Sequence, residues 1–361
     1  MAINNKLGVQ KQMEYKVIKK EYIFEDDRPY KSCHASTILD LPGEEMLAAW
    51  FGGTHEGADD VAIWFSRRTE GRWTYPAKAA DIEGIPHWNP VLLKKKDDTI
   101  LLFYQDGHKI PDWKSKVTIS TDYGKTWSEP KEIVEGARGG RGPIKNKPIV
   151  LADGTWLAPC SGEIGPWNAF VDISKDEGVT WTKSSLIPLI REPSDNMKYF
   201  ENNESTINIK EIPELPEHYL VVKGRGIIQP TLWESDLGII HMLLRSCEGL
   251  ILRSDSKDSG KTWSPVYSVG LPNNNSGIDM VKLDNGTLVL VCNPVEKDWG
   301  PRTPLVIYIS NDNGQTWTKM LTLEDEPGEY SYPAIIARGN EIFITYTWKR
   351  ERIAFWQIVL A

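Results

Sequence analysis

Short apolar runs, each opened by a tight polar turn, recur along the whole chain. Six segments share this form, namely EEMLAAW, DDTILLFY, DGTWLAPC, DLGIIHMLLR, NGTLVLVC and GNEIFITY. Upstream of each lies a second apolar run that opens with a small residue or a proline, as in HAST, NPVLL and YPAII. Proline is tolerated at the start of a strand because no ladder hydrogen bond needs its missing N–H there. The pattern predicts adjacent β strands in six repeated units.

A motif of the form S-x-D-x-G-x-T-W repeats within these units. Asp side chains cap nearby backbone N–H groups and Gly accepts a positive φ, so the motif favours a tight turn. Short alternating strands flank each copy, which predicts a hairpin turn whose Trp packs into the core of the same unit. The copies begin at Ser120, Ser174, Ser256 and Ser310, and a degenerate copy begins at Ser66.

The spacing of this motif predicts the architecture. Successive starts are 54, 54, 82 and 54 residues apart, and the long interval indicates an insertion at about residues 185–225. Six units of about four strands predict an all-β fold, a single six-bladed β-propeller over residues 1–361. The last unit has three strands of its own, so residues 15–24 are expected to add the fourth and close the ring. The insertion is either a surface ornament or a lid that shapes a pocket.

Polar residues occupy the positions that a propeller directs towards its axis. The residue before each strand-opening position is expected to lie near the axis, where a closed core would have apolar side chains. All six are polar, which predicts a polar funnel and a ligand site. They are His34, Asn89, Lys147, Gln229, Ser276 and Tyr332.

Further candidate residues lie close to this ring in the sequence. Arg245 ends an apolar strand, Arg302 opens another, and Tyr330 precedes Tyr332. The stretch WFGGTHEGADD contributes Trp50, Glu56, Asp59 and Asp60. Arg, Lys and Tyr that converge on one axis fit recognition of a carboxylate, because guanidinium groups match a planar anion. The structural alternatives are solvated arginines, packed tyrosines and aspartates that cap a loop.

Charge and composition exclude several classes of protein. The net charge is −8 and the isoelectric point about 5.4, which argues against binding to nucleic acid or an anionic membrane. The N-terminal stretch has no apolar run typical of a signal peptide, so we expect a soluble, cytoplasmic protein. The histidines show no zinc spacing and no nucleotide-binding motif occurs, so neither a metal nor a cofactor is expected. The oligomeric state stays open.

The whole chain resembles the BNR-repeat-like proteins of the sialidase superfamily. The motifs CHAST, WFGGTHEGADDVAIWFSRR, WNPVL, IKNKP, LPNNNSG, PRTPL, EPGEYSYPA and YTWKRERI carry the resemblance, and the repeated turns resemble Asp boxes. The resemblance implies that Arg245 and Arg302 are two of three carboxylate-binding arginines. It also places Asp59 or Asp60, with Glu56 nearby, at the acid/base position and Tyr330 or Tyr332 at the nucleophile position.

Two positions depart from the family pattern. His34 stands where the first arginine is expected, and Gln229 stands where a glutamate would support the tyrosine. A neutral amide cannot take the proton of a tyrosine as a carboxylate can. Hydrolysis of an ordinary sialoside is therefore less expected than a related reaction of an acidic sugar.

Three functions remain open from the sequence. The first is a sialidase-like glycoside hydrolase acting on a glycan that contains sialic or uronic acid. Arginines and Lys147 at the axis would hold the carboxylate, an acid among Asp60, Asp59 and Glu56 would protonate the leaving oxygen, and a tyrosine would attack. Asn89, Gln229, Trp50 and Ser276 would complete the substrate site.

The second function is a uronate-specific polysaccharide lyase in which His34 is the base and a tyrosine the acid, while the cations stabilise the enolate-like intermediate. The third is a glycan-binding propeller without catalysis.

Overall fold

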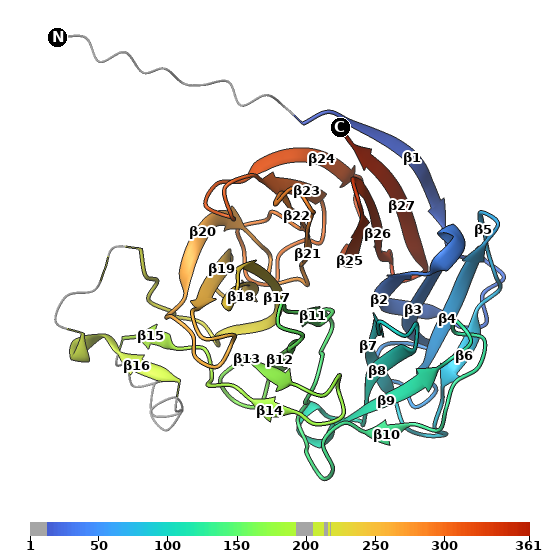
Figure 1. Cartoon of the computed structure of the whole chain (residues 1–361), viewed down its shortest axis with the longest axis horizontal. Helices are drawn as coiled ribbons and strands as arrows, with labels where there is room; N and C mark the ends of the chain where they lie inside the picture. Colours follow the sequence, from blue (N-terminus) through green and yellow to red (C-terminus); the bar gives the residue numbers. More distant parts are fainter. Residues whose placement is uncertain (1–12, 193–204, 213–215, 217) are drawn as a thin grey trace.

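The computed structural model describes residues 13–192, 205–212, 216 and 218–361. Its described strands form seven sheets, six of which surround one axis, so the predicted all-β, six-bladed propeller is confirmed (Figure 1). Blade 1 contains β2 (Ser32–Asp40), β3 (Met46–Gly53), β4 (Ala62–Thr69), β5 (Arg72–Trp73) and β6 (Ala77–Ala80). Blade 2 contains β7 (His87–Lys94), β8 (Ile100–Asp106), β9 (Lys114–Ser120) and β10 (Lys131–Glu132). Blade 3 contains β11 (Ile149–Val150), β12 (Trp156–Gly162), β13 (Asn168–Ser174) and β14 (Thr182–Lys183).

The second half of the chain repeats this arrangement. Blade 4 contains β17 (Ile227–Asp236), β18 (Ile239–Ser246), β19 (Leu250–Ser256) and β20 (Tyr267–Pro272). Blade 5 contains β21 (Asp279–Lys282), β22 (Leu288–Cys292), β23 (Leu305–Ser310) and β24 (Thr318–Glu324). Blade 6 contains β25 (Tyr330–Arg338), β26 (Glu341–Trp348), β27 (Arg352–Leu360) and β1 (Tyr15–Tyr22). The short 3₁₀ helices η1 (Pro42–Glu44), η2 (Ile110–Asp112) and η4 (Ile209–Glu211) lie in connections of the described chain.

The N-terminal strand closes the ring, as the sequence predicts. Strand β1 pairs antiparallel with β27, with Tyr15 opposite Leu360 and Tyr22 opposite Ala354. Blade 6 is therefore built from both ends of the described chain. This closure removes the free sheet edge that β27 would otherwise present.

The described part of the insertion packs at blades 3 and 4. Strands β15 (Leu189–Arg191) and β16 (Thr206–Asn208) form a small parallel sheet. Tyr219 pairs with Tyr267 on the outermost strand of blade 4, and Val222 is buried in the cluster between the two blades. Residues 193–204, 213–215 and 217, over which the predicted insertion also extends, lie outside the described residues.

The repeated motif forms the predicted hairpin turns. In the first copy, Asp122 accepts hydrogen bonds from the backbone N–H groups of Lys125 and Thr126 and from the Thr126 hydroxyl, at 3.0, 2.9 and 2.6 Å. The Ser120 hydroxyl accepts from Gly124 N–H at 2.8 Å. The carboxylates at Asp176, Asp258 and Asp312 repeat this pattern. One side chain thus satisfies several turn N–H groups at once.

The tryptophans of these turns pack differently from the prediction. The Trp127 ring lies 5.9 Å from Phe65, and the Trp73 ring lies 5.3 Å from Phe355, so these two turns contact the preceding blade. Trp181 contacts both sides, with its ring 6.4 Å from Phe103 of blade 2 and 6.5 Å from Trp156 of its own blade. The reason is the position of the turn at the outer end of a blade, where the large ring reaches the neighbouring sheet. Six clusters of buried apolar side chains are likewise divided between adjacent blades.

A buried polar network ties four blades together beneath the axis. Lys145 Nζ donates to the carbonyl oxygens of Ile278 and Pro333 at 2.8 and 2.6 Å. Lys147 Nζ pairs with both carboxylate oxygens of Asp279 at 2.9 and 2.8 Å. Asp279 also accepts from the Thr231 hydroxyl and from the backbone of Ile335. The IKNKP motif therefore joins blades 3, 4, 5 and 6.

Candidate active site

Each blade reaches the axis through one residue in the left-handed region. Such φ values cost about 1–2 kcal/mol outside glycine and are frequent at functional sites. The register of the inner strand shifts at this point in β2, β7, β17 and β25. The residues and their φ angles are Ala35 (55°), Asn89 (46°), Lys145 (68°), Gln229 (52°), Asn275 (56°) and Tyr332 (53°).

In three blades the left-handed residue differs from the one that the pattern placed near the axis. It is Ala35 where the pattern had His34, Lys145 where it had Lys147, and Asn275 where it had Ser276. His34 nevertheless lines the axial cavity, whereas Lys147 and Ser276 do not. In blade 3 the inner strand has only two residues and follows an irregular segment, so the strand-opening proline lies beyond the axis. The offset is one residue in blades 1 and 5 and two residues in blade 3.

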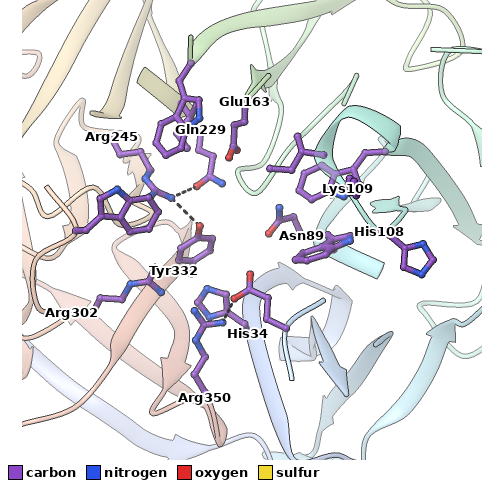
Figure 2. Close-up of a pocket in the computed structure, with 17 residues that line it drawn as sticks. His34, Asn89, His108, Lys109, Glu163, Gln229, Arg245, Arg302, Tyr332 and Arg350 are labelled. Carbon is purple, nitrogen blue, oxygen red and sulfur yellow. Dashed lines mark hydrogen bonds and ion pairs between the residues drawn. The ribbon is translucent and has the colours of Figure 1, made fainter. Parts of the chain in front are cut away.

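A cavity of about 540 Å³ opens at the axis (Figure 2). Seven residues singled out from the sequence line it, namely His34, Glu56, Asn89, Gln229, Arg245, Arg302 and Tyr332. The sequence analysis missed ten others, namely Trp88, His108, Lys109, Ile110, Trp113, Glu163, Trp167, Ile228, Trp299 and Arg350. Most of these ten lie in loops between strands, where no periodic pattern marks them. Two of the ten had a signal, because Trp88 belongs to the quoted motif WNPVL and Arg350 belongs to YTWKRERI.

Arg245 is held among neutral acceptors beside Tyr332. Its Nη1 donates to the Tyr332 hydroxyl at 2.9 Å and to Gln229 Oε1 at 3.1 Å, as the dashed lines in Figure 2 mark. Its Nε donates to Asn275 Oδ1 at 3.0 Å, and its Nη2 donates to the Asn275 carbonyl. The side chain is 2% exposed, and none of these bonds goes to a carboxylate. A buried charge of this kind favours an anion in the cavity.

Arg302 and Arg350 share one carboxylate. Glu329 Oε1 accepts from Arg302 Nη1 at 2.7 Å and from Arg350 Nε at 2.5 Å. Arg350 Nη1 also pairs with Glu56 at 2.6 Å. Burial would raise the pKa of Glu329, but the charges of the two arginines outweigh it and hold that pKa below its usual value. Glu329 therefore stays ionised and orients both guanidinium groups.

His34 lies against Tyr332 at the base of the cavity. The two ring centres are 4.2 Å apart, and His34 Nδ1 lies 2.9 Å from the Thr347 hydroxyl oxygen. Burial, followed by the charges of the nearby cations, lowers the pKa of His34 well below its usual value. The imidazole is therefore neutral at neutral pH. The cations are Arg350, Arg302, Lys145 and Arg245.

The two aspartates of the HEGADD stretch organise a loop. Asp60 accepts from the Thr54 backbone N–H at 3.0 Å and from the Thr54 hydroxyl at 2.7 Å. Burial raises the pKa of Asp60, but these hydrogen bonds outweigh it and lower that pKa. Asp59 is 72% exposed at its side chain and pairs with His108 Nε2 at 3.0 Å. Neither aspartate is among the residues that line the cavity.

Four other candidates lie in the core, away from the cavity lining. Trp50 is fully buried and donates to the Tyr30 hydroxyl at 2.7 Å. Tyr330 is buried between blades 5 and 6, and Ser276 is buried near the axis. Lys147 is bound to Asp279 as described above. None of these four side chains is among those that line the cavity.

Two pairs of tryptophans lie at the cavity. Trp88 and Trp113 have ring centres 5.3 Å apart, and Trp167 and Trp299 have ring centres 6.1 Å apart. Trp299 is 61% exposed. Large flat apolar surfaces beside charged groups suit a ligand with both apolar faces and polar edges, as sugars have.

The described residues contain no group of three His, Cys, Asp or Glu side chains that could hold a metal ion. Nor does the described part of the chain contain a helix that is long and apolar enough to cross a membrane.

The fold and the cavity define the class of this protein as a six-bladed β-propeller with an arginine-lined axial site. The sequence model of the BNR repeat-like domain matches residues 44–344, so the chain belongs to that family. None of the curated protein sequences matches this chain.

Solved structures share the fold at low sequence identity. A protein of unknown function from Dyadobacter fermentans is 16% identical, with a TM-score of 0.71 over 96% of this chain and 99% of that one. Trypanosoma rangeli sialidase in complex with sialic acid is 13% identical, with a TM-score of 0.65 over 96% of this chain and 58% of that one. The K499G mutant of NanB sialidase from Streptococcus pneumoniae is 14% identical, with a TM-score of 0.66 over 94% of this chain and 70% of that one. The propeller is therefore sialidase-like, and the chain spans less than two thirds of the Trypanosoma enzyme.

Proposed function

We propose that the protein is a glycoside hydrolase that binds the carboxylate of an acidic sugar in its axial cavity. One observation carries the proposal: the guanidinium groups of Arg245, Arg302 and Arg350 all line the same cavity. Guanidinium groups bind carboxylates through paired hydrogen bonds, and several of them around one space select an anionic ligand. Both a sialic acid and a uronic acid carry the required carboxylate.

The donors of Arg302 and Arg350 are only partly used within the described residues, whereas each guanidinium nitrogen of Arg245 already donates. Arg302 donates from Nη1, and Arg350 donates from Nε and Nη1, so Nη2 of each has no partner there. A ligand carboxylate would therefore gain hydrogen bonds without breaking those that position the arginines. Arg350 would take the place of the arginine that the family pattern has at His34.

Tyr332 would act at the reacting sugar. Its ring has the cations of Arg302, Arg245 and Lys145 at 5.5, 5.7 and 5.8 Å. Positive charges around a phenol stabilise negative charge that develops on its oxygen, and some glycosidases use a tyrosine nucleophile. Gln229 is 3.1 Å from Arg245 and cannot serve as the base for this tyrosine.

The test is turnover of acidic glycans by the purified protein. The panel contains sialosides, glucuronides and uronate polysaccharides, with release of reducing ends as the readout. Arg302→Met is expected to lose about 30-fold or more in kcat/KM, because a buried charge interaction is worth about 2–5 kcal/mol. Arg72→Met on the outermost strands of blade 1 is the matched control and should keep wild-type rates. Retained turnover in Arg302→Met would contradict the proposed carboxylate site.

A second candidate function is a uronate lyase, and the state of His34 favours it. A neutral, buried imidazole against Tyr332 can take a proton next to a carboxylate that the arginines hold. Lyase products carry a new double bond that absorbs in the ultraviolet. New absorbance that disappears in His34→Ala would select the lyase over the hydrolase, and binding without any turnover would select a binding module.

A further inference from the structure

Two glutamates, Glu56 and Glu163, line the cavity, and they differ in their ion pairing. Glu56 forms an ion pair with Arg350 at 2.6 Å. Glu163, in the loop after β12, makes no hydrogen bond or ion pair with any residue that the structure describes. Figure 2 shows its carboxyl group directed into the cavity near Gln229. Glu163 is therefore the lining carboxyl group whose oxygens remain available to a ligand.

The surroundings of Glu163 favour its protonated form. Burial is the largest influence and raises the pKa of Glu163 above its usual value. Arg245 and Arg225 lower that pKa, and the charge of Glu56 raises it further. Asp60 and Glu329 have the opposite shift, since hydrogen bonds and cations hold them ionised. Carboxyl groups whose pKa values are separated in this way divide the roles of proton donor and ionised partner.

We propose that Glu163 is the catalytic acid and base of the reaction, an inference that rests on the hydrolase function proposed above. The bond between the anomeric carbon and the glycosidic oxygen breaks, its electron pair stays on the oxygen, and that oxygen takes the Glu163 proton. A water molecule then adds its hydroxyl to the anomeric carbon and returns its proton to the Glu163 carboxylate. The products are two sugars with new hydroxyl groups, and Glu163 ends in its initial state.

With Glu163 as the acid and base, the aspartates of the HEGADD loop are expected to have a structural role and not a catalytic one. Asp60 is occupied by Thr54, and Asp59 lies outside the cavity lining beside His108. Blade 3 therefore supplies the proton donor that the family resemblance had assigned to blade 1. The assignment of the acid to Glu163 and its assignment to Asp60 can be separated with two substrates that differ in their leaving group.

The experiment compares wild type, Glu163→Gln and Asp60→Asn on two substrates with the same acidic sugar. One substrate has a sugar leaving group, and the other has an acidic nitrophenol that departs without protonation. In Glu163→Gln, kcat/KM, which reports the bond-breaking step, is expected to fall 100-fold or more on the first substrate and less than 10-fold on the second, because general acid catalysis is worth about 10²–10⁴-fold. The alkaline limb of the kcat/KM profile should disappear in this variant. Asp60→Asn should reduce both rates by the same factor.

Each result is decisive. Equal losses on both substrates in Glu163→Gln would assign it a structural role, and wild-type rates in this variant would exclude it from the reaction, while the proposed hydrolase function stands in both cases. A selective loss in Asp60→Asn instead would return the role to Asp60. Absence of turnover by the wild-type protein would overturn the hydrolase function and the role of Glu163 together. An unchanged melting temperature of Glu163→Gln, together with partial activity of Glu163→Asp, would exclude misfolding as the cause of a loss.

Discussion

Arg245 on β18 donates to the hydroxyl of Tyr332 on β25 at 2.9 Å, although 87 positions separate them in the sequence. The bond joins blade 4 to blade 6 across the cavity. It fixes the phenolic oxygen at the point where the cations converge. The closed ring is therefore what assembles the site.

Removal of this hydroxyl tests its role in turnover. In Tyr332→Phe the ring can still pack against His34, so we expect a normally folded protein that binds acidic sugars. Its kcat should fall on the order of 100-fold, since a group that acts on the transition state has been removed. Calorimetric binding and steady-state kinetics measure the two effects separately. An unchanged kcat would exclude Tyr332 from the reaction.

The N-terminal strand is expected to be required for stability. A chain that begins at residue 25 lacks β1 and leaves the edge of β27 unpaired. We expect its melting temperature to fall by more than about 5 °C relative to a chain that begins at residue 13. Thermal unfolding followed by circular dichroism measures the difference. Equal melting temperatures would mean that closure through β1 contributes little.

Lys147 is expected to act on stability and not on ligand binding. Its Nζ pairs with the buried Asp279, which has a side-chain exposure of 3%. Lys147→Met leaves that carboxylate without its cation, which costs about 3–5 kcal/mol when a buried pair is broken. Denaturant unfolding should show the loss, while the folded fraction keeps its affinity for acidic sugars. Lower affinity at unchanged stability would instead make Lys147 a ligand-binding residue.

The turn glycines test the packing between blades. Gly124 has a φ of +79°, and a Cβ there would lie 2.9 Å from Leu47 Cδ2 in the preceding blade. Gly136 has a φ of +73° with open space around it, so Gly136→Ala reports the cost of the backbone alone. We expect Gly124→Ala to lose about 1–3 kcal/mol more than Gly136→Ala, because overpacking adds to the backbone strain. Equal losses of unfolding free energy in Gly124→Ala and Gly136→Ala, measured with denaturant, would show that the turn is not tightly packed against blade 1.

The buried imidazole predicts a particular pH dependence of stability. Unfolded histidine has a pKa of about 6.5, and that of His34 in the fold lies well below its usual value. The unfolded chain then binds one more proton as the pH falls below about 6.5, so the contribution to stability decreases towards acid by at most about 1.4 kcal/mol per pH unit. His34→Asn should therefore show a shallower loss of melting temperature between about pH 6.5 and 4.5. Parallel curves for the two proteins would contradict a neutral His34.

The propeller was predictable from the sequence because its signals are local. The Asp and Gly of each turn act within eight residues, and their spacing counts the blades. The cavity depends instead on loops that meet only after the ring has closed. Glu163 and Arg350 lie in such loops. No pattern marks Glu163, and the motif YTWKRERI contains Arg350 without showing that it reaches the cavity. A register difference of two residues was enough to confuse Lys147 with Lys145 at the axis.

Because every apolar cluster is divided between two blades, a single blade is not expected to fold by itself. No single sheet carries a complete hydrophobic core, so an excised blade would expose both of its faces to water. The apolar contacts that stabilise the fold therefore lie at the junctions between adjacent blades and not within one blade. Six such junctions in a circle leave no terminal one from which unfolding could begin, unlike an open array of repeats that frays from its ends. Opening the junction where Phe355 of blade 6 packs with Trp50 of blade 1 would turn the circle into such an array, and the pairing of β1 with β27 opposes that step because it ties the chain entering blade 1 to blade 6.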